Sequence, residues 1–385
     1  MRIAIFSDTF LPQTNGVANV VYHSAKNLAE RGHQVWVFTV SGDYKKNNDD
    51  EKITIVILPS IGAGVYQGER FTLPIGLALN RLRKFNPDVI HSHTPLSVGW
   101  EAILGAKLLR TGLVGTHHTF YDHYLKHLKA DYDWAKKLSW KYTLAYYNCC
   151  DLILSPSQSL ADALQEKGIK KPIEVLKNSI RTDFFVPVKD LATKTRLKKE
   201  FGINSKSLVY MGRISYEKSI DQLIRAFALA SSKNPQIELV IIGDGPERKS
   251  LESLTKNLGV EDKIIFTGTL RGEELVRGLQ ANDIFITASK TENMPLSVLE
   301  AMSAGLPIIA VSEKGLKEIV NNKINGFLVP ADDTEAMAKK IIELISDDNL
   351  LKQFSAASRA TAEAEYSPES ISSSLEKHYQ KIIKK

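Results

Sequence analysis

Residues 287–305 read TASKTENMPLSVLEAMSAG, a stretch that predicts a strand followed directly by a helix. The apolar run at 283–286 predicts the end of a buried strand, and Leu296, Leu299 and Met302 then recur at helical spacing. Pro295 has no N–H and fits the first helical turn, where amide groups lack intrahelical partners. The stretch therefore predicts a strand-to-helix junction, the place where open α/β sheets bind ligands.

Two carboxylates belong to this junction. Glu292 precedes the helix and Glu300 lies about two turns inside it. Carboxylates so placed accept hydrogen bonds from ligand hydroxyls, while the free N–H groups and the helix dipole suit a phosphate or a sugar oxygen. The alternative is that Glu292 only stabilises the helix dipole and Glu300 is solvated.

Strand and helix patterns alternate along the whole chain, which predicts an α/β protein with parallel, doubly wound sheets. In the first half the expected strands are 2–6, 34–40, 53–58, 89–91, 113–116 and 152–154, and the expected helices are 17–31, 73–85, 99–110 and 124–149. In the second half the expected strands are 208–211, 238–242, 264–266, 284–286 and 307–310, and the expected helices are 220–232, 247–258, 272–279, 296–304, 334–345, 349–365 and 371–383. The pattern pauses near residues 177–201. We therefore expect two Rossmann-like domains, residues 1–180 and 181–365, that face a central cleft. We expect the C-terminal helix, residues 366–385, to return to the first domain.

Composition agrees with an ordinary globular protein. The 385 residues are 43% hydrophobic and 24% charged. Residues 1–180 carry 21 Lys/Arg against 16 Asp/Glu, whereas the remainder carries 29 against 28. Cys149 and Cys150 are adjacent, which argues against a disulfide framework. No N-terminal signal or long apolar run is visible, so we expect a cytoplasmic protein, with peripheral membrane association left open.

Three loops after expected strands carry glycines and cations. Asn15-Gly16 follows the first strand, and its dipeptide permits a positive φ before a helix that offers N–H groups to a phosphate. Gly212-Arg213 with Lys218 follows the first strand of the second half, where a guanidinium fork and a point charge suit phosphate oxygens. Gly243 lets the backbone approach a ligand closely. For each loop the alternative is an ordinary turn.

Six of the nine histidines fall between residues 91 and 127. These histidines could form a metal site, but His123 and His127 lack the His-Glu-x-x-His pattern of zinc sites. His118 follows an expected strand and can orient a hydroxyl or stabilise developing charge. No phosphate-loop pattern or aromatic-basic nucleic-acid pattern is present, so we expect neither a metal cofactor nor a nucleic-acid partner.

These motifs together resemble the retaining glycosyltransferases of family four, which have the GT-B fold. The resemblance rests on Glu292 and Glu300, on Gly212-Arg213 with Lys218, on Asn15-Gly16 and on His118-Thr119, and it runs over nearly the whole chain. It implies a nucleotide-sugar donor and a metal-independent enzyme that retains the anomeric configuration.

The resemblance also implies roles for particular residues. Arg213 and Lys218 would bind the pyrophosphate, Glu300 the ribose, Glu292 a sugar hydroxyl, and Gly16 the phosphates from the first domain. His118 would lie at the reacting sugar. The remaining expected donor-binding residues are Gly212, Gly243, Asn293, Met294, Pro295 and Leu296, and the expected acceptor-binding residues are His118, Thr119, Tyr121 and Tyr124. The sequence departs from the common Glu-Gly-Phe-Gly at Glu292-Asn293-Met294-Pro295, where Pro295 removes one backbone donor, and a serine, Ser219, follows Lys218.

The stretch 118–124 is similar to that of family members that glycosylate diacylglycerol or related lipids. Residues 104–150 carry seven Lys/Arg against three Asp/Glu, with Trp134, Trp140, Tyr142 and Tyr146 interleaved. This composition fits an anionic membrane surface, or alternatively a domain core with solvated lysines. We therefore expect transfer of a hexosyl group from a UDP-glucose-like donor to a membrane lipid such as diacylglycerol. The alternatives are a GDP-mannose-dependent mannosyltransferase acting on a glycolipid or glycan, and a non-catalytic nucleotide-sugar-binding protein.

Overall fold

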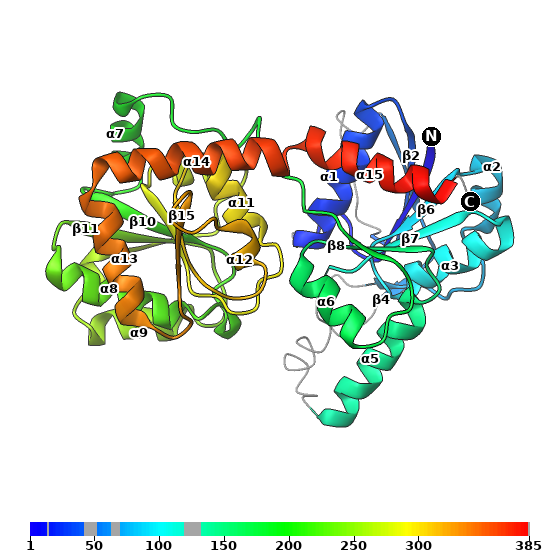
Figure 1. Ribbon diagram of the computed structural model, residues 1–385, viewed down its shortest axis with the longest axis horizontal. Coiled ribbons are helices and arrows are strands. Elements are labelled where there is room, and N and C mark those ends of the chain that lie inside the picture. The colour runs from blue at the N-terminus through cyan, green and yellow to red at the C-terminus, as the bar shows by residue number, and fades with distance from the viewer. Residues whose placement is uncertain (14, 42–51, 63–69, 119–131, 384–385) are drawn as a thin grey trace. The chain divides into compact units, whose positions relative to one another are not determined.

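The computed structural model describes residues 1–13, 15–41, 52–62, 70–118 and 132–383. The chain divides into two compact units, Met1–Ser179 with Pro368–Lys385 and, separately, Ile180–Ser367 (Figure 1). Each unit has its own parallel sheet, and each is described by itself.

The sheet of the first unit has the strand order β3-β2-β1-β6-β7-β8-β9, all parallel. Its strands are β1 (Arg2–Ser7), β2 (Gln34–Thr39), β3 (Ile53–Ile57), β6 (Val89–Ser92), β7 (Gly112–Thr116), β8 (Leu152–Ser155) and β9 (Ile173–Val175), and a separate antiparallel pair is formed by β4 (Ile61–Gly62) and β5 (Arg70–Phe71). Residues 3–6 of β1 are all fully buried, as expected for a parallel strand covered on both faces. The order reverses between β1 and β6, which makes their carboxyl ends the switch point of this sheet.

Helices cover both faces of this sheet with separate apolar cores. The helices are α1 (Gly16–Glu30), α2 (Leu79–Phe85), α3 (Ser97–Leu109), α5 (Asp133–Tyr147), α6 (Gln158–Glu166) and α15 (Pro368–Ile383). One core joins residues of α2, α3 and α5 to the sheet, and the other joins α1 and α15 to it.

The last helix, α15, completes the first unit and lies beside α1 in Figure 1. Leu375, Tyr379 and Ile382 belong to the same buried cluster as Val21 and Leu28 of α1. At the surface of this contact, the Arg31 guanidinium donates two hydrogen bonds to the Glu376 carboxylate, Nε–Oε1 2.7 Å and Nη2–Oε2 2.8 Å. The final helix is therefore an integral layer of the first unit.

The second unit has the strand order β12-β11-β10-β13-β14-β15, again all parallel. Its strands are β10 (Lys206–Met211), β11 (Ile237–Ile242), β12 (Ile264–Gly268), β13 (Ile284–Thr287), β14 (Ile308–Val311) and β15 (Gly326–Val329). Its helices are α7 (Leu191–Glu200), α8 (Ile220–Lys233), α9 (Arg248–Asn257), α10 (Gly272–Gln280), α11 (Leu296–Ser303), α12 (Leu316–Ile319), α13 (Thr334–Ser346) and α14 (Asp348–Tyr366), with short 3-10 turns η2 (Tyr216–Lys218) and η3 (Glu261–Lys263). The order is that of a Rossmann sheet, with the switch point between β10 and β13.

The helix predicted over 73–85 is wrong in its first part, because α2 begins only at Leu79. Thr72 donates from its backbone N to Ser97 Oγ at 3.1 Å, and Gly76 N donates to Glu101 Oε1 at 2.7 Å. These bonds to α3 hold residues 72–78 outside a helix, and Pro74 also disfavours helical geometry in the residue before it. Tertiary hydrogen bonds therefore override the apolar spacing of this segment.

Candidate functional site

Two loops leave the sheet of the second unit at its switch point. The first joins β10 to α8 through residues 212–219, and the second joins β13 to α11 through residues 288–295. Because β10 and β13 are hydrogen-bonded neighbours, the two loops emerge side by side at the carboxyl edge of the sheet. Residues 74 positions apart in sequence, Lys218 and Glu292, thus meet.

Lys218 and Glu292 form an ion pair between the two loops, with Nζ 2.6 Å from Oε1. Their side chains are 22% and 18% exposed, so solvent still reaches both. An ion pair of this exposure contributes modestly to stability. The pair places an ammonium group beside a carboxylate. A ligand that carries phosphate and hydroxyl groups could bind both, its phosphate at the ammonium and its hydroxyl at the carboxylate.

Arg213 lies on the same β10–α8 loop and is exposed. Among the described residues, no carboxylate is paired with its guanidinium, whereas Lys218 is neutralised by Glu292. The loop therefore carries one paired and one unpaired cation, together with the Glu217 carboxylate, whose Oε1 accepts from Ser215 Oγ. The carbonyl oxygen of Arg213 accepts a hydrogen bond from the Tyr210 hydroxyl at 3.2 Å.

Gly243 closes β11 beside Gly212, and the two backbones touch. Gly243 has φ 141°, and a Cβ built there would lie 1.9 Å from the Gly212 carbonyl oxygen. Gly212 N in turn donates to the Ile242 carbonyl at 3.0 Å. A side chain at position 243 would thus displace the start of the loop that carries Arg213 and Lys218.

The loop of Glu292 is held by Gly315, a residue that sequence reasoning missed. Gly315 N donates to the Glu292 carbonyl at 3.1 Å, and a Cβ on Gly315 would lie 1.4 Å from the Asn293 carbonyl oxygen. Asn293 and Met294 are buried beneath this contact. We predicted that Pro295 lies in the first turn of the helix. In the structure Pro295 is the N-cap of α11, and Leu296 is the first helical residue.

Glu300 is the fifth residue of α11, the helix that follows this loop. Burial raises the pKa of its carboxyl to about 8, although part of the side chain remains exposed. No hydrogen-bond donor among the described residues reaches this carboxyl, which leaves nothing to stabilise its charged form. Glu300 is therefore mostly protonated at neutral pH until a donor arrives.

Gly16 belongs to the first unit, where it is the first residue of α1. Gly16 does not use the positive φ that the Asn-Gly dipeptide permits, because Asn15 caps the helix, its side chain accepting from Ala18 N at 2.8 Å. The physical reason is that capping satisfies an otherwise unpaired amide. A Cβ at Gly16 would meet nothing within 4 Å, so its backbone is open to approach.

The switch point of the first unit contains buried polar groups that the sequence did not single out. The Asp8 carboxylate accepts from Thr94 Oγ1 at 2.7 Å, Ser97 Oγ at 2.6 Å and Val98 N at 2.9 Å. Burial raises the pKa of Asp8 even though these donors oppose that effect. Asp8 thereby joins the end of β1 to the start of α3.

His118 follows β7 and contacts a second buried histidine. Its Nε2 lies 3.0 Å from Nδ1 of His93, and burial lowers the pKa of His118 to about 4 and that of His93 well below its ordinary value. Both rings are therefore neutral at neutral pH, so His118 offers hydrogen bonds and no positive charge. His91 continues the network, with Nδ1 2.7 Å from the Tyr379 hydroxyl of α15 and Nε2 2.6 Å from Thr116 Oγ1.

Some predicted residues lie beyond what the structure describes. Thr119, Tyr121 and Tyr124 of the expected acceptor site, and His123 and His127 of the weighed metal site, fall in residues 119–131. Within the described ranges, no cluster of three or more His, Cys, Asp or Glu is arranged to hold a metal ion.

Helix α5 exposes one face on which apolar and basic residues alternate. Trp134, Leu138 and Tyr142 recur every fourth residue and are 66%, 58% and 40% exposed, with Lys137 and Lys141 beside them. Tyr146, in contrast, is fully buried in the core. The aromatic residues named for this region are thus divided between exposed and buried positions of one helix, and contact with a membrane stays a prediction. No described helix has the length and apolar character needed to cross a membrane.

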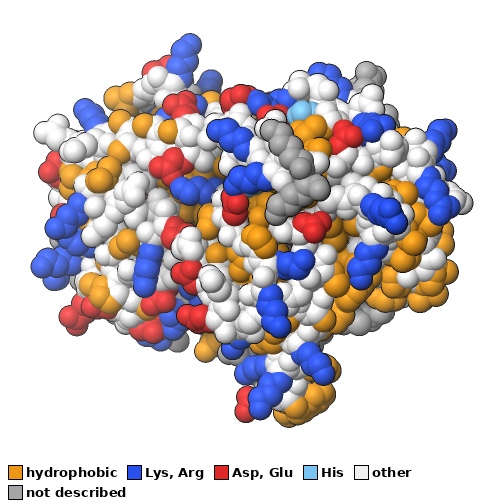
Figure 2. All heavy atoms as spheres, turned by 45° about the vertical axis from the view of Figure 1, so that its right-hand side comes forward, with side chains coloured by type: hydrophobic (Ala, Val, Ile, Leu, Met, Phe, Trp, Pro, Cys, Tyr) orange, Lys and Arg blue, Asp and Glu red, His pale blue; other side chains and the backbone are white. Residues whose placement is uncertain are grey.

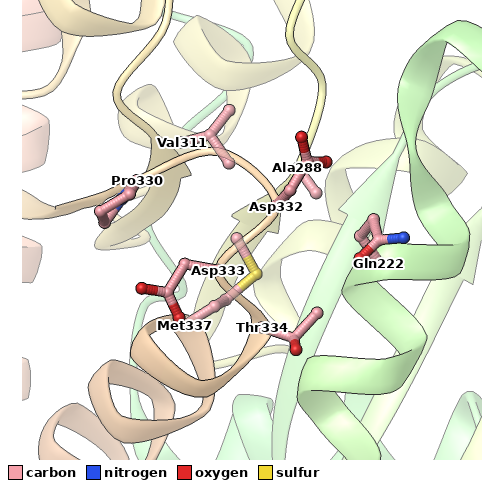
Figure 3. A pocket seen from close by; sticks show the side chains of 8 residues that line it. All are labelled: Gln222, Ala288, Val311, Pro330, Asp332, Asp333, Thr334 and Met337. Atoms are coloured by element: carbon pink, nitrogen blue, oxygen red, sulfur yellow. The ribbon is translucent and has the colours of Figure 1, made fainter.

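A small hollow of about 10 Å³ lies in the second unit beside the start of the β13–α11 loop (Figure 3). It has room for about one water molecule. Gln222 of α8 faces Thr334 and Met337 of α13 there, beside Val311 at the end of β14 and residues that follow β13 and β15. Lys218, Glu292 and Glu300 do not line this hollow.

Two family models match the chain in succession. The model "Glycosyltransferase Family 4" matches residues 14–184, and "Glycosyl transferases group 1" matches residues 193–361. The alpha-monoglucosyldiacylglycerol synthase of Streptococcus pneumoniae is 30% identical over 332 residues, 85% of this chain and 75% of that protein. The enzyme of the same name from Acholeplasma laidlawii is 28% identical over 100% of this chain and 98% of its own. A GDP-mannose-dependent alpha-mannosyltransferase of Corynebacterium glutamicum is 27% identical over 100% of this chain and 89% of its own.

Solved structures agree on the fold. The Anabaena protein HepE in complex with UDP has a TM-score of 0.78 at 18% identity, covering 99% of this chain and 100% of that one. Sucrose-phosphate synthase from Thermosynechococcus elongatus has a TM-score of 0.77 at 20% identity, covering 99% and 98%. With two Rossmann sheets, a GT-B fold and a relative of 30% identity, the chain belongs to the family four glycosyltransferases.

Proposed function

We propose that this glycosyltransferase moves a hexosyl group from UDP-glucose, or a closely similar nucleotide sugar, to a hydroxyl of a membrane lipid such as diacylglycerol. Two relatives named alpha-monoglucosyldiacylglycerol synthase, aligned over 85% and 100% of the chain, support this acceptor. The observation that carries the proposal is the Lys218–Glu292 pair, which unites a phosphate partner and a hydroxyl partner beside Arg213.

Charge accounting at the loops favours a diphosphate ligand. Without donor, Glu292 is paired with Lys218, and no carboxylate of the described residues is paired with Arg213. When a sugar hydroxyl donates to Glu292, the Lys218 ammonium is released toward the phosphates, and the two cations face two negative charges. This neutralisation needs no metal ion and grows as the diphosphate leaves, which is the requirement for transition-state stabilisation.

The other predicted donor-binding residues take roles around this centre. Glu300 accepts the ribose hydroxyls, since its carboxyl lacks a donor among the described residues. The backbone at Gly16, Gly212 and Gly243 approaches the phosphates, and residues 293–296 contact the sugar.

The reaction proceeds with retention at the anomeric carbon. The acceptor hydroxyl attacks from the face that the diphosphate leaves, so the bond from C1 to the phosphate oxygen breaks as the bond from C1 to the acceptor oxygen forms. The acceptor proton passes to an oxygen of the departing diphosphate, which balances the step. His118, a neutral imidazole, orients a hydroxyl of the reacting sugar.

The acceptor is reached at a membrane surface. Thr119, Tyr121 and Tyr124 are its proposed contacts, and the exposed face of α5 is the proposed contact with anionic lipid within residues 104–150. Each lysine near such a surface adds about 1 kcal/mol. The protein is then peripheral on the cytoplasmic face of the membrane.

A GDP-mannose-dependent reaction is the second candidate. It is favoured by the Corynebacterium mannosyltransferase, which aligns with the full chain at 27% identity. Incubation with UDP-glucose, UDP-galactose and GDP-mannose in turn, with diacylglycerol in mixed micelles, separates the candidates by which nucleoside diphosphate is released. Release from none of them in the presence of acceptor, with nucleotide binding retained, would identify a non-catalytic binder.

Lys218→Ala tests the site itself. We expect turnover to fall by about 10²–10³-fold, because a charge aimed at the leaving group is lost. Lys233→Ala is the matched control, since Lys233 ends α8, about 20 Å from its start, and is exposed. Wild-type turnover in Lys218→Ala would mean that the diphosphate binds elsewhere.

The lysines of α5 have their own test. Changing Lys136, Lys137 and Lys141 to Glu should abolish co-sedimentation with vesicles of phosphatidylglycerol and phosphatidylcholine, while transfer to a dissolved acceptor persists. Unchanged binding would end the idea that α5 is the contact.

A further inference from the structure

His93 is a buried polar residue of the first unit to which the proposed reaction gives no part. Its side chain is 2% exposed, and its backbone N, just beyond the end of β6, donates to the Phe6 carbonyl of β1 at 2.9 Å. Figure 2 shows hardly any histidine on the face that it draws, in keeping with the burial of this ring and of His91. Burying an imidazole costs free energy unless its nitrogens are hydrogen-bonded, so the partners of this ring matter.

The two ring nitrogens of His93 have different surroundings. Nδ1 lies 3.0 Å from Nε2 of His118, and the two rings are nearly parallel, at 16°. No hydrogen-bond partner among the described residues reaches Nε2 of His93. Because burial keeps both rings neutral at neutral pH, each ring carries one proton on a nitrogen. One of the two histidines therefore donates to the other.

The unpaired nitrogen decides the direction of this hydrogen bond. If His118 donated, His93 would carry its proton on Nε2, as a buried N–H group without an acceptor in the described part of the chain. A buried N–H group left without an acceptor is rarer in folded proteins than an acceptor with a spare lone pair. His93 therefore donates from Nδ1 to Nε2 of His118, and neutral His118 carries its own proton on Nδ1.

The ring behind His93 is held in place by α15. His91 packs against His93 with ring centroids 4.1 Å apart, and both nitrogens of His91 are hydrogen-bonded, Nδ1 to the hydroxyl of Tyr379 at 2.7 Å and Nε2 to that of Thr116 at 2.6 Å. Tyr379 is itself fully buried. Because turning His91 would break two buried hydrogen bonds, this ring keeps His93 at the angle at which it meets His118.

The hollow beside these rings is too small for a sugar. It measures about 20 Å³ and is lined by residues at the ends of β6 and β7, by residues of α1 and α15, and by the segment 176–179. It has room for about one or two water molecules. A substrate therefore does not reach His93, and any effect of this ring on the reaction passes through His118.

We propose that His93 is a positioning residue: its Nδ1–H donates to Nε2 of His118 and thereby fixes both the orientation and the tautomer of the His118 ring. The hydroxyl of the reacting sugar then accepts a hydrogen bond from Nδ1–H of His118. This inference rests on the proposed function, which assigns His118 to the reacting sugar. It adds the residue that sets which nitrogen of His118 carries the proton, since the bond at one ring nitrogen determines the state of the other.

Turnover by matched variants measures the positioning. His93→Phe should lower kcat by about tenfold to a hundredfold with little change in the donor KM, because a loosened His118 misplaces the sugar and not the nucleotide. His93→Asn should recover most of that loss, since its amide nitrogen lies close to the place of Nδ1 and can donate to His118. An equal loss in the two variants would overturn the proposal.

The matched control is His33→Phe. His33 precedes β2 at the amino edge of the same sheet, whereas His93 and His118 lie at the carboxyl edge, and its Nε2 lies 2.8 Å from Glu376 Oε1. This variant also loses a hydrogen bond of a partly buried ring, so it shows what a general loss of stability does to turnover. Equal kcat in His33→Phe and His93→Phe would refute the positioning role.

A double-variant cycle shows whether the effect passes through His118. In the His118→Ala background, His93→Phe should lower kcat by less than about twofold, because the ring that His93 positions is gone. A loss as large as that in the wild-type background would mean that His93 acts on the reaction by another route, and the proposal would then be wrong.

Nitrogen-15 spectra of histidine-labelled protein show the tautomer without any substrate. At neutral pH the signals of His118, identified by their absence from His118→Gln, should be those of a protonated Nδ1 and an unprotonated Nε2. In His93→Phe these two signals should move towards each other as the ring exchanges between tautomers. A proton on Nε2 of His118 in the wild-type protein, or signals that do not change in His93→Phe, would contradict the assignment.

The spectra and the assays together separate this proposal from the proposed function. If the wild-type protein transfers no sugar from any nucleotide sugar, yet shows the expected tautomer and loses it in His93→Phe, the proposed function fails and the hydrogen bond from His93 to His118 stands. If the wild-type protein transfers sugar but the tautomer of His118 does not depend on His93, the positioning role fails and the proposed function stands.

Discussion

Replacing Glu300 by glutamine should make the second unit more stable, and increasingly so as the pH rises from acidic to mildly alkaline. The carboxyl has a pKa of about 8 in the folded protein, against an ordinary 4.5, because burial disfavours its charged form. A raised pKa means that the folded state holds a proton that the unfolded state releases, so stability falls as pH rises between these two values and is level above about 8. Glutamine has nearly the same shape as glutamate and stays neutral, so the Glu300→Gln variant does not lose stability in this way as the pH rises.

The size of the effect follows from the shift. At about 1.4 kcal/mol per pH unit, the advantage of Glu300→Gln over wild type should grow by roughly 3 kcal/mol between about pH 5 and pH 8. Urea unfolding followed by far-ultraviolet circular dichroism at both ends of this range measures it. Free energies of unfolding that change in parallel for the two proteins would refute the burial argument.

Nucleotide binding gives an independent check on the same carboxyl. A pKa of about 8 leaves about a tenth of Glu300 ionised at pH 7 and about nine tenths at pH 9. If ribose hydroxyls donate to the ionised form, the affinity of wild type for UDP should rise about tenfold over that interval, while that of Glu300→Gln stays level. Isothermal titration calorimetry measures both, and equal pH dependence in the two proteins would place the ribose elsewhere.

Two further substitutions probe contacts that hold each unit together. Gly315→Ala should raise the donor KM by about tenfold or more and destabilise the second unit by about 1–3 kcal/mol, because a Cβ there would lie 1.4 Å from the Asn293 carbonyl oxygen. Gly62→Ala is the control, since a Cβ at Gly62 would meet nothing within 4 Å. Equal kinetics in the two variants would contradict the role of the Gly315 contact. Glu376→Gln should cost roughly 2 kcal/mol at neutral pH, because the hydrogen bonds from Arg31 lower the pKa of Glu376 to about 2. This cost should fade as pH falls from about 4.5 to about 2 in acid-unfolding curves, and a cost independent of pH would exclude the charge as its cause.

The local sequence pattern was enough to predict most strands and to predict that the loops of Lys218 and Glu292 lie side by side. Buried parallel strands are short continuous apolar runs, so β1 and β13 were visible in sequence, and the switch point then requires the loops of Lys218 and Glu292 to be neighbours. Most helices, such as α8, also follow their apolar spacing.

What the sequence did not predict depends on contacts distant along the chain. Gly315 and Asn293 follow two paired strands, β14 and β13, and approach each other in the fold, and the raised pKa of Glu300 is a consequence of tertiary burial. The segment before α2 has helical spacing but is held open by Glu101, and the cap formed by Asn15 decided the conformation of Gly16. In each case a hydrogen bond or a close approach between elements overrides a local preference.

The place of α15 has a consequence for biosynthesis. The second unit is one uninterrupted segment, Ile180–Ser367, whereas the core of the first unit includes Leu375, Tyr379 and Ile382. Multidomain chains generally fold their N-terminal domain first as they leave the ribosome. Here the first unit stays incomplete until residue 382 has emerged, so the nascent chain holds an open apolar face beside β6 and β7 throughout the synthesis of the second unit, a natural binding surface for a ribosome-associated chaperone.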